Sequence, residues 1–146
     1  AAQAQYAYPG CAAITDKDFT ATTVVSRTNS ADIYEPLKMD FQMDADGNVD
    51  IFFIERKGAI KFYDGKTKAV RVLGTIAPLE IGGEDGLTGL ALDPDFKNKK
   101  RIFLYYATKP TFRVSRFNLD PATLALQPAT EKVLLEWPSS RGRCTP

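Results

Sequence analysis

The sequence predicts an all-β protein, namely a β-propeller built of four-stranded antiparallel blades, of which about two are present in this chain. Two observations lead to this prediction. Short runs of β-branched and aromatic residues are separated by turns such as Asp46-Gly47-Asn48 and Asp64-Gly65-Lys66. The same order of four runs then occurs twice, at an offset of about fifty residues, which is the period typical of a propeller blade.

The first predicted blade follows an N-terminal extension. Residues 1–34 form this extension, with one predicted strand at Thr22–Ser26 and a polar loop at Arg27-Thr28-Asn29-Ser30. The four strands of the blade are then predicted at Leu37–Met43, Val49–Glu55, Ala59–Asp64 and Ala69–Ile76.

The second predicted blade repeats this order. Asp44-Ala45-Asp46 before the second strand corresponds to Asp93-Pro94-Asp95 in the later set. No segment combines a helical period with caps, and Asp120-Pro121-Ala122-Thr123-Leu124 suits a turn. The predicted strands are Thr88–Leu92, Arg101–Thr108, Phe112–Leu119 and Lys132–Glu136.

The number of blades bears on the domain organisation. A sandwich or a closed barrel is the alternative architecture for so many short strands, but the internal repeat favours the propeller. Propellers need at least about four blades to close. We therefore expect residues 35–146 to be the first two blades of a domain whose remaining blades come from a continuation of the polypeptide or from another chain.

The composition excludes several classes of function. Nineteen basic against eighteen acidic residues give a formal net charge of +1, so no global field would recruit nucleic acid or an anionic membrane. The longest clear apolar run, Ile51-Phe52-Phe53-Ile54, is far shorter than the ~18 residues that cross a bilayer. The chain has no histidine, so acid–base chemistry by this polypeptide alone would use Asp, Glu, Lys or Tyr.

Two cysteines, Cys11 and Cys144, lie near opposite ends of the chain. They form no CxxC pair, which argues against a zinc or thioredoxin-like site. A disulfide between them is the simplest use, and closing so long a loop would contribute roughly 4 to 5 kcal/mol in an oxidising compartment. The start Ala1-Ala2-Gln3-Ala4-Gln5 is typical of the product of signal-peptide removal, although a cloning remnant would look similar. We expect a secreted protein.

The best candidate site is the loop that contains Glu84 and Asp85. Gly82, Gly83 and Gly86 bracket these carboxylates and would let a ligand approach the backbone closely. Either carboxylate could line the mouth of the propeller and bind substrate hydroxyls, or the loop could be an acidic solvent-exposed turn.

Other charged segments give weaker signals. Arg56 could pair with an anionic sugar or a cofactor carboxylate, and an intramolecular ion pair is the alternative. The segment 44–48 has two carboxylates before a glycine but lacks the distal glutamate of a calcium loop, so we interpret it as a hairpin turn. The same interpretation applies to Asp93 and Asp95, and we predict no metal ligands in this chain. The basic run Lys97–Arg101 is interpreted as a charged hairpin tip.

Aromatic residues on the predicted strands are expected to fill the packing between blades. Trp137, at the end of the last strand, could be a platform for a sugar ring, but core packing is the preferred interpretation. The strand aromatics assigned to the packing are Phe52, Phe53, Phe103, Tyr105 and Phe117.

Several segments resemble the N-terminal blades of the glucose/sorbosone dehydrogenase family, the soluble pyrroloquinoline-quinone-dependent sugar dehydrogenases. The resemblance covers about residues 33 to 144. Its most specific part is the glycine-rich acidic run from Gly82 to Asp93-Pro94-Asp95-Phe96. The other matching segments are Tyr34-Glu35-Pro36, Phe53–Lys61, Val114–Phe117 and Lys132–Glu136.

This resemblance implies a six-bladed propeller whose mouth holds the quinone beside calcium, with a histidine as general base on the sugar hydroxyl. In such relatives that histidine follows a segment resembling residues 138–144, and this chain stops at Pro146. The resemblance thus implies that the base, the calcium ligands and most quinone contacts lie outside the chain. Glu84 falls where glucose-oxidising relatives carry a glutamine that faces the active site.

The leading expectation is therefore the N-terminal part of a secreted sugar dehydrogenase that oxidises a sugar or a sugar-derived aldehyde. One alternative is a secreted polysaccharide lyase or hydrolase on the same propeller. Another is a propeller that only binds carbohydrate or protein, because a fold does not fix its chemistry.

Overall fold

The computed structural model describes residues 19–25 and 33–139 of the chain. These residues form two four-stranded antiparallel sheets and one single-turn helix. The first sheet contains β1 (Pro36–Met43), β2 (Val49–Glu55), β3 (Ala59–Tyr63) and β4 (Val70–Thr75). The second contains β5 (Leu87–Leu92), β6 (Arg101–Ala107), β7 (Thr111–Leu119) and β8 (Leu126–Pro138), with α1 (Phe96–Lys99) between β5 and β6.

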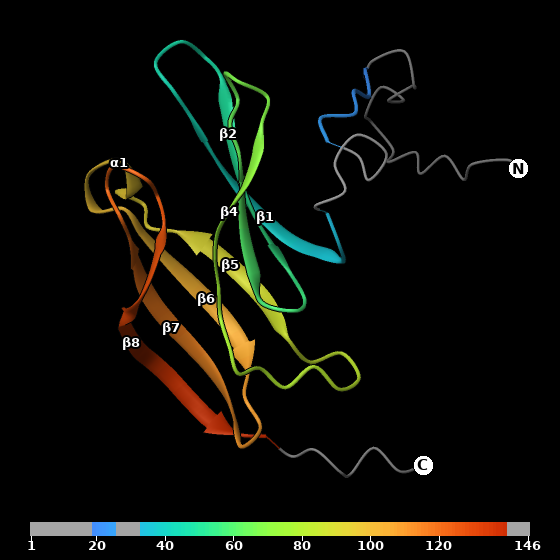
Figure 1. Cartoon of the computed structure of the whole chain (residues 1–146), viewed down its shortest axis with the longest axis vertical. Coiled ribbons are helices and arrows are strands. Elements are labelled where there is room, and N and C mark those ends of the chain that lie inside the picture. Colours follow the sequence, from blue (N-terminus) through green and yellow to red (C-terminus); the bar gives the residue numbers. More distant parts are fainter. Residues whose placement is uncertain (1–18, 26–32, 140–146) are drawn as a thin grey trace, which may run out of the picture.

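Each sheet is a meander in which consecutive strands are neighbours (Figure 1). The eight strands of the two predicted blades are confirmed. The last strand begins earlier than predicted, because Leu126 and Gln127 pair with Leu119 and Asn118 before a register shift. The short helix α1 was not predicted, since four residues are too few to show a helical period.

The predicted strand Thr22–Ser26 is wrong over the part that the structure describes. Residues 22–25 are irregular, and Ser26 lies outside the described residues. The β-branched residues Thr22 to Val25 suit a strand locally, but a strand needs a neighbour for its backbone hydrogen bonds. Within the described residues, no strand of the first sheet pairs with this segment.

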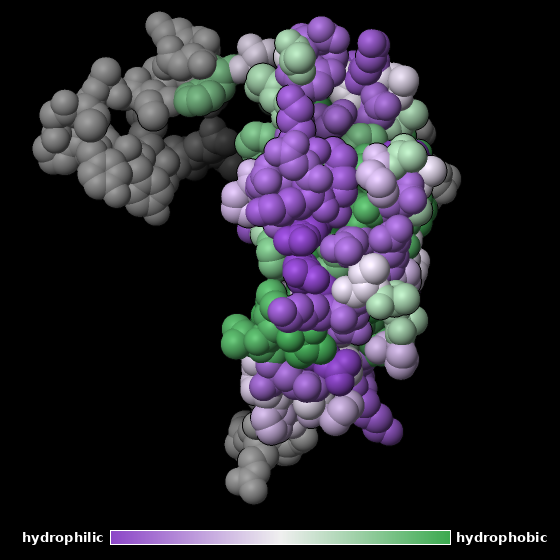
Figure 2. All heavy atoms as spheres, turned by 90° about the vertical axis from the view of Figure 1, so that its left-hand side faces the viewer, coloured by the Kyte–Doolittle hydropathy of each residue, from purple (hydrophilic) through white to green (hydrophobic). Residues whose placement is uncertain are grey.

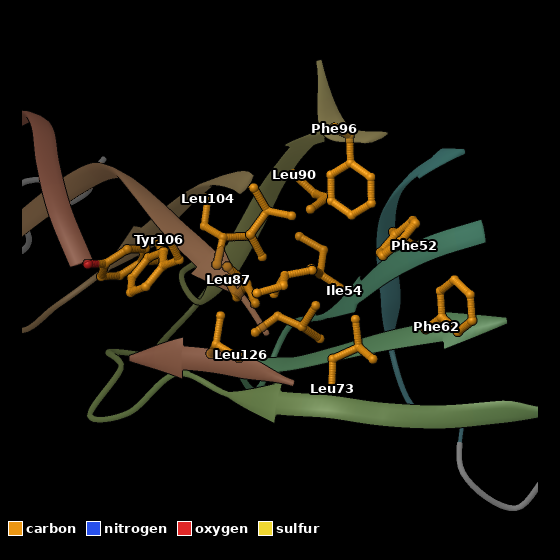
Figure 3. Packing of buried hydrophobic residues seen from close by; sticks show 14 residues of the cluster. Phe52, Ile54, Phe62, Leu73, Leu87, Leu90, Phe96, Leu104, Tyr106 and Leu126 are labelled. Atoms are coloured by element: carbon orange, nitrogen blue, oxygen red, sulfur yellow. The ribbon is translucent and has the colours of Figure 1, made fainter. Parts of the chain in front are cut away.

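The core lies between the two sheets (Figure 3). Because side chains alternate along a strand, β2 directs Phe52 and Ile54 to the second sheet, and β3 does the same with Ile60 and Phe62. The ring of Phe52 contacts those of Phe62 and Phe96, each at 4.9 Å between centroids. The second sheet contributes Leu87, Leu90, Ile102, Leu104, Tyr106, Phe117, Leu119 and Leu126.

Three of the five predicted inter-blade aromatics, Phe53, Phe103 and Tyr105, lie outside the core between these two sheets. Phe52 and Phe117 are in the core, but Phe103 and Tyr105 alternate with its members along β6 and therefore lie on the outward face of the second sheet. Trp137 stacks on Tyr105 at 5.8 Å and is 40% exposed. The prediction that Trp137 packs in the core is thus wrong for the core between these two sheets.

The outward face of the first sheet carries Phe53, which is buried but is not a member of the shared core. Phe53 pairs with Met39 on β1, whose side chain is largely exposed. Figure 2 views the molecule from the left-hand side of Figure 1 and shows a mainly hydrophilic surface with one hydrophobic patch in its lower half. Exposed apolar residues of β8 include Val133, Leu134 and Leu135.

Polar contacts also join the two sheets. The Asp40 carboxylate on β1 accepts a hydrogen bond from the Leu92 amide on β5 at 2.8 Å. Arg71 on β4 donates to the Thr123 carbonyl at 2.6 Å.

The strand connections divide between two ends of the molecule. The β2–β3 turn, the β4–β5 loop and the β6–β7 turn lie at one end, near the chain that leaves β8, and this end is at the bottom of Figure 1. We call it the loop end. The other connections, including α1, lie at the opposite end. The helix in the described part of the chain does not have the length and apolarity needed to cross a membrane.

Candidate functional site at the loop end

Arg56 is the residue directly after β2, and its guanidinium binds the β4–β5 loop. Its Nη1 donates to the carbonyl oxygens of Ile81 at 2.7 Å, Asp85 at 3.2 Å and Gly83 at 3.4 Å. Its Nε donates to the Glu35 carboxylate at 3.2 Å. The structure thus contains the intramolecular ion pair that was the alternative prediction for Arg56.

The main chain of Arg56 also holds this loop. The Arg56 carbonyl accepts from the Leu87 amide at 2.9 Å, and a Cβ placed on Gly86 would lie only 2.4 Å from that carbonyl oxygen. Gly86 has a φ of 138°, a conformation that residues with a side chain rarely adopt. The glycine therefore permits a close approach of the Arg56 main chain, whereas the predicted approach of a ligand to this loop stays a prediction.

Glu84 lies at the exposed tip of the loop, and Asp85 is partly buried beside it. The Asp85 amide donates to the Gly82 carbonyl at 3.1 Å, which closes a turn around Glu84. The Gly82 amide donates to the Glu80 carboxylate at 3.0 Å. The structure thus brings Arg56 against the β4–β5 loop that carries Glu84 and Asp85.

The loop end also contains a buried ion pair that sequence patterns did not reveal. Lys61 Nζ lies 2.7 Å from Glu55 Oε1, and both side chains are less than a tenth exposed. The same carboxylate oxygen accepts from the Tyr34 amide at 2.6 Å. The alternation of β2 and β3 places the pair on the outward face of the first sheet, where it fixes the chain that enters β1.

A polar group on β7 and β8 lies near the β6–β7 turn. Glu136 accepts from Arg113 and from the Thr111 hydroxyl, each at 2.8 Å. The bond from Arg113 and then that from Thr111 lower the pKa of Glu136, since both favour the ionised carboxylate. Ser139 continues this edge by donating its amide to the Pro110 carbonyl at 3.0 Å.

A second group extends from the core toward β8. The Tyr106 hydroxyl contacts the Ser115 hydroxyl at 3.1 Å and donates to the Glu131 carboxylate. Burial and then the bond to Glu131 raise the pKa of Tyr106, so its hydroxyl remains protonated at neutral pH. Tyr106 and Ser115 are buried within the two-sheet unit, so this group supports packing.

The aspartate carboxylates in the turns accept hydrogen bonds from nearby main-chain amides. Asp44 accepts from the amides of Asp46 and Asn48, and the bonds from the Asn48 side chain and then its backbone lower the pKa of Asp44. Asp93 accepts from the Asp95 amide at 2.9 Å in the turn that precedes α1. Within residues 19–25 and 33–139, no group of three or more His, Cys, Asp or Glu side chains is arranged to hold a metal ion.

Cys11 and Cys144 lie outside the described residues, so the predicted disulfide stays a prediction.

The fold is shared with solved β-propeller sugar dehydrogenases, which contain a similar two-sheet unit. An aldose sugar dehydrogenase from Streptomyces coelicolor, solved in a form bound to pyrroloquinoline quinone, matches with a TM-score of 0.59 and 23% identity over 72% of this chain. A putative glucose dehydrogenase from Thermus thermophilus matches with a TM-score of 0.55 and 23% identity over 76% of it. The chain spans 31% and 32% of these two proteins.

The chain belongs to the glucose/sorbosone dehydrogenase family, whose model matches residues 33–141. A comparison with curated proteins finds no significant match. The matched range includes both sheets and every residue of the candidate site.

Arg56, Lys61 and Arg113 do not by themselves fit pyrroloquinoline quinone. This cofactor carries several carboxylates and therefore requires cations or N–H donors. The donors of Arg56 are directed to Glu35 and to loop carbonyls, and Lys61 and Arg113 are paired with glutamates. The exposed Glu84 carboxylate suits hydroxyl donors better than an anionic quinone.

Proposed function

We propose that this chain is the N-terminal part of a secreted quinoprotein-like sugar dehydrogenase that oxidises a sugar or a sugar-derived aldehyde. The observation that carries the proposal is the loop held by Arg56, which exposes Glu84 at the loop end of a chain of this family. In this proposal, pyrroloquinoline quinone and calcium are bound by the rest of the propeller, together with the general base.

The two sheets would form one wall of the substrate mouth. Ionised carboxylates only accept hydrogen bonds, so Glu84 can accept from sugar hydroxyls, with Asp85 as the second candidate. The paired Arg56 and Glu35 add little net charge, which leaves the wall suited to neutral, hydroxyl-rich substrates. Orientation of the sugar is therefore the role that we assign to this part of the protein.

The proposal is tested with the complete protein, loaded with pyrroloquinoline quinone and calcium. Reduction of a redox dye is followed with a panel of aldoses, against the same protein without the quinone. We expect reduction only with both quinone and sugar. The absence of dye reduction with every sugar, together with an absorbance rise from an unsaturated uronate on polysaccharide, would show a lyase instead.

Secretion and the disulfide between Cys11 and Cys144 belong to the same proposal. Intact mass after thiol alkylation, with and without prior reduction, tests the disulfide. Alkylation of both cysteines without reduction would contradict it.

A further inference from the structure

We propose that Arg56 is a positioning residue for substrate recognition, because it holds the loop in the shape that presents Glu84. This inference rests on the proposed function, since it assumes that Glu84 contacts the sugar. Arg56 itself would not touch the substrate.

The Arg56 guanidinium binds main-chain carbonyls that precede and follow Glu84 in the sequence. Nη1 donates to Ile81 and Gly83 on one side and to Asp85 on the other. Hydrogen bonds from a charged donor are stronger than those between neutral groups. A single cationic nitrogen therefore fixes the backbone on both sides of Glu84.

The backbone from which the Arg56 side chain extends is held in place by hydrogen bonds. Arg56 directly follows Ile54 and Glu55 of β2, which are both buried. Its amide donates to the Glu35 carbonyl at 3.2 Å, and its carbonyl accepts from Leu87 at the start of β5. The side chain thus extends from a point that is tied to both sheets.

Apart from Arg56, the exposed part of the loop is shaped by local hydrogen bonds, from the Asp85 amide to the Gly82 carbonyl and from the Gly82 amide to Glu80. Ile81, Gly82, Gly83 and Glu84 are all exposed, so apolar packing adds little. Glycines also have more backbone freedom to lose than other residues. Without the guanidinium, three carbonyl dipoles would converge with no donor between them, and we expect the loop to open.

Glu35 completes the arrangement by directing the guanidinium. It binds Nε and so leaves Nη1 facing the loop. Lysine at position 56 could supply one ammonium to the carbonyls but could not bind Glu35 in the same geometry. The Arg56→Lys variant is therefore expected to retain part of the effect.

The test uses the complete, quinone-loaded protein and a double-mutant cycle between Arg56→Ala and Glu84→Ala. Loss of a hydrogen bond to a charged group predicts that each single variant raises KM for the sugar by roughly tenfold or more, with kcat changed less than about twofold. The double variant should be no worse than Glu84→Ala alone. Arg56→Lys should lie between wild type and Arg56→Ala.

Arg71→Ala is the matched control. Arg71 also donates to a main-chain carbonyl, that of Thr123, but at the opposite end of the sheets. It should leave KM unchanged. Effects of Arg56→Ala and Glu84→Ala that simply add, or a loss confined to kcat, would overturn the positioning role.

Hydrogen exchange gives a readout that does not depend on activity. In Arg56→Ala, the amides of residues 81–86 should exchange faster while those of β2 and β6 keep their rates. Unchanged exchange in the loop would overturn the inference even if the protein oxidises sugars. Faster exchange in a protein that oxidises no sugar would instead reject the proposed function, and it would still show that Arg56 fixes the shape of the loop.

Discussion

At the scale of single residues, the candidate site depends on a close approach between Arg56 and Gly86. A side chain at Gly86 would meet both the carbonyl oxygen and the Cγ of Arg56, at 2.4 and 2.8 Å. The position also has a φ of 138°. Backbone conformation and space thus both require glycine here.

Gly86→Ala is expected to destabilise the protein by about 2–4 kcal/mol, through backbone strain and displacement of Arg56. Chemical denaturation measures this loss. Gly47→Ala is the control, because Gly47 has a φ of 82° but nothing within 4 Å of an added Cβ. It should lose only about 1 kcal/mol of strain. Equal losses would contradict the role of the Arg56 contact.

A pH dependence follows from Asp120 in the β7–β8 turn. Its carboxylate accepts from the amide and then the hydroxyl of Thr123, and these bonds lower the pKa of Asp120 below its ordinary value of 3.8. A lowered pKa means that the carboxylate stabilises the fold above about pH 4 and that this contribution is lost on further acidification.

Asp120→Asn should therefore lower the melting temperature at neutral pH, and the difference from wild type should shrink below about pH 4. Thermal melts at several pH values measure it. A difference that stays constant down to strongly acidic pH would contradict the carboxylate's role in the turn.

At the scale of elements, alternation and turn residues suffice to predict the strands, because both are local features of the sequence. The extension of β8 back to Leu126 depends on pairing with β7, and residues 22–25 lack a strand neighbour within the described chain. The loop with Glu84 could be predicted from its glycines. The contacts between Arg56 and that loop could not, since they join segments whose closeness only the fold determines.

The contact between the sheets gives a prediction for Leu126. This side chain is 8% exposed, and its Cβ would lie 2.6 Å from a Cβ added at Gly74 on β4. Leu126→Ala should lower the free energy of unfolding by about 2–5 kcal/mol. Lys132→Ala, at an exposed position of the same strand, should change it by less than about 0.5 kcal/mol. A small effect of Leu126→Ala would show that the two sheets are not packed as described.

At the scale of the whole molecule, the outward face of the second sheet indicates a further blade. Tyr105, Phe112 and Trp137 pack together there, with centroid distances of 5.8 to 6.1 Å. On the same face, Arg116 Nε and Asn118 Oδ1 are buried without a hydrogen-bond partner among the described residues. A neighbouring blade would cover the rings and supply these partners.

Trp137→Ala in the complete protein should accordingly cost about 3–5 kcal/mol, as for a core aromatic residue. Denaturant unfolding measures this loss. This loss of stability is larger than expected for a side chain that is 40% exposed, as Trp137 is in the two-sheet unit. A loss below about 1 kcal/mol would indicate that no blade packs on this face.

The central claim, that the loop end is the substrate mouth, is tested most directly by hydrogen exchange of the complete, quinone-loaded protein with and without a sugar that it oxidises. The account predicts slower exchange in the β2–β3 turn and in the loop around Glu84, and unchanged exchange in α1 and the turns beside it. Protection confined to the end that carries α1, or no protection around Glu84 while the sugar is oxidised, would contradict it.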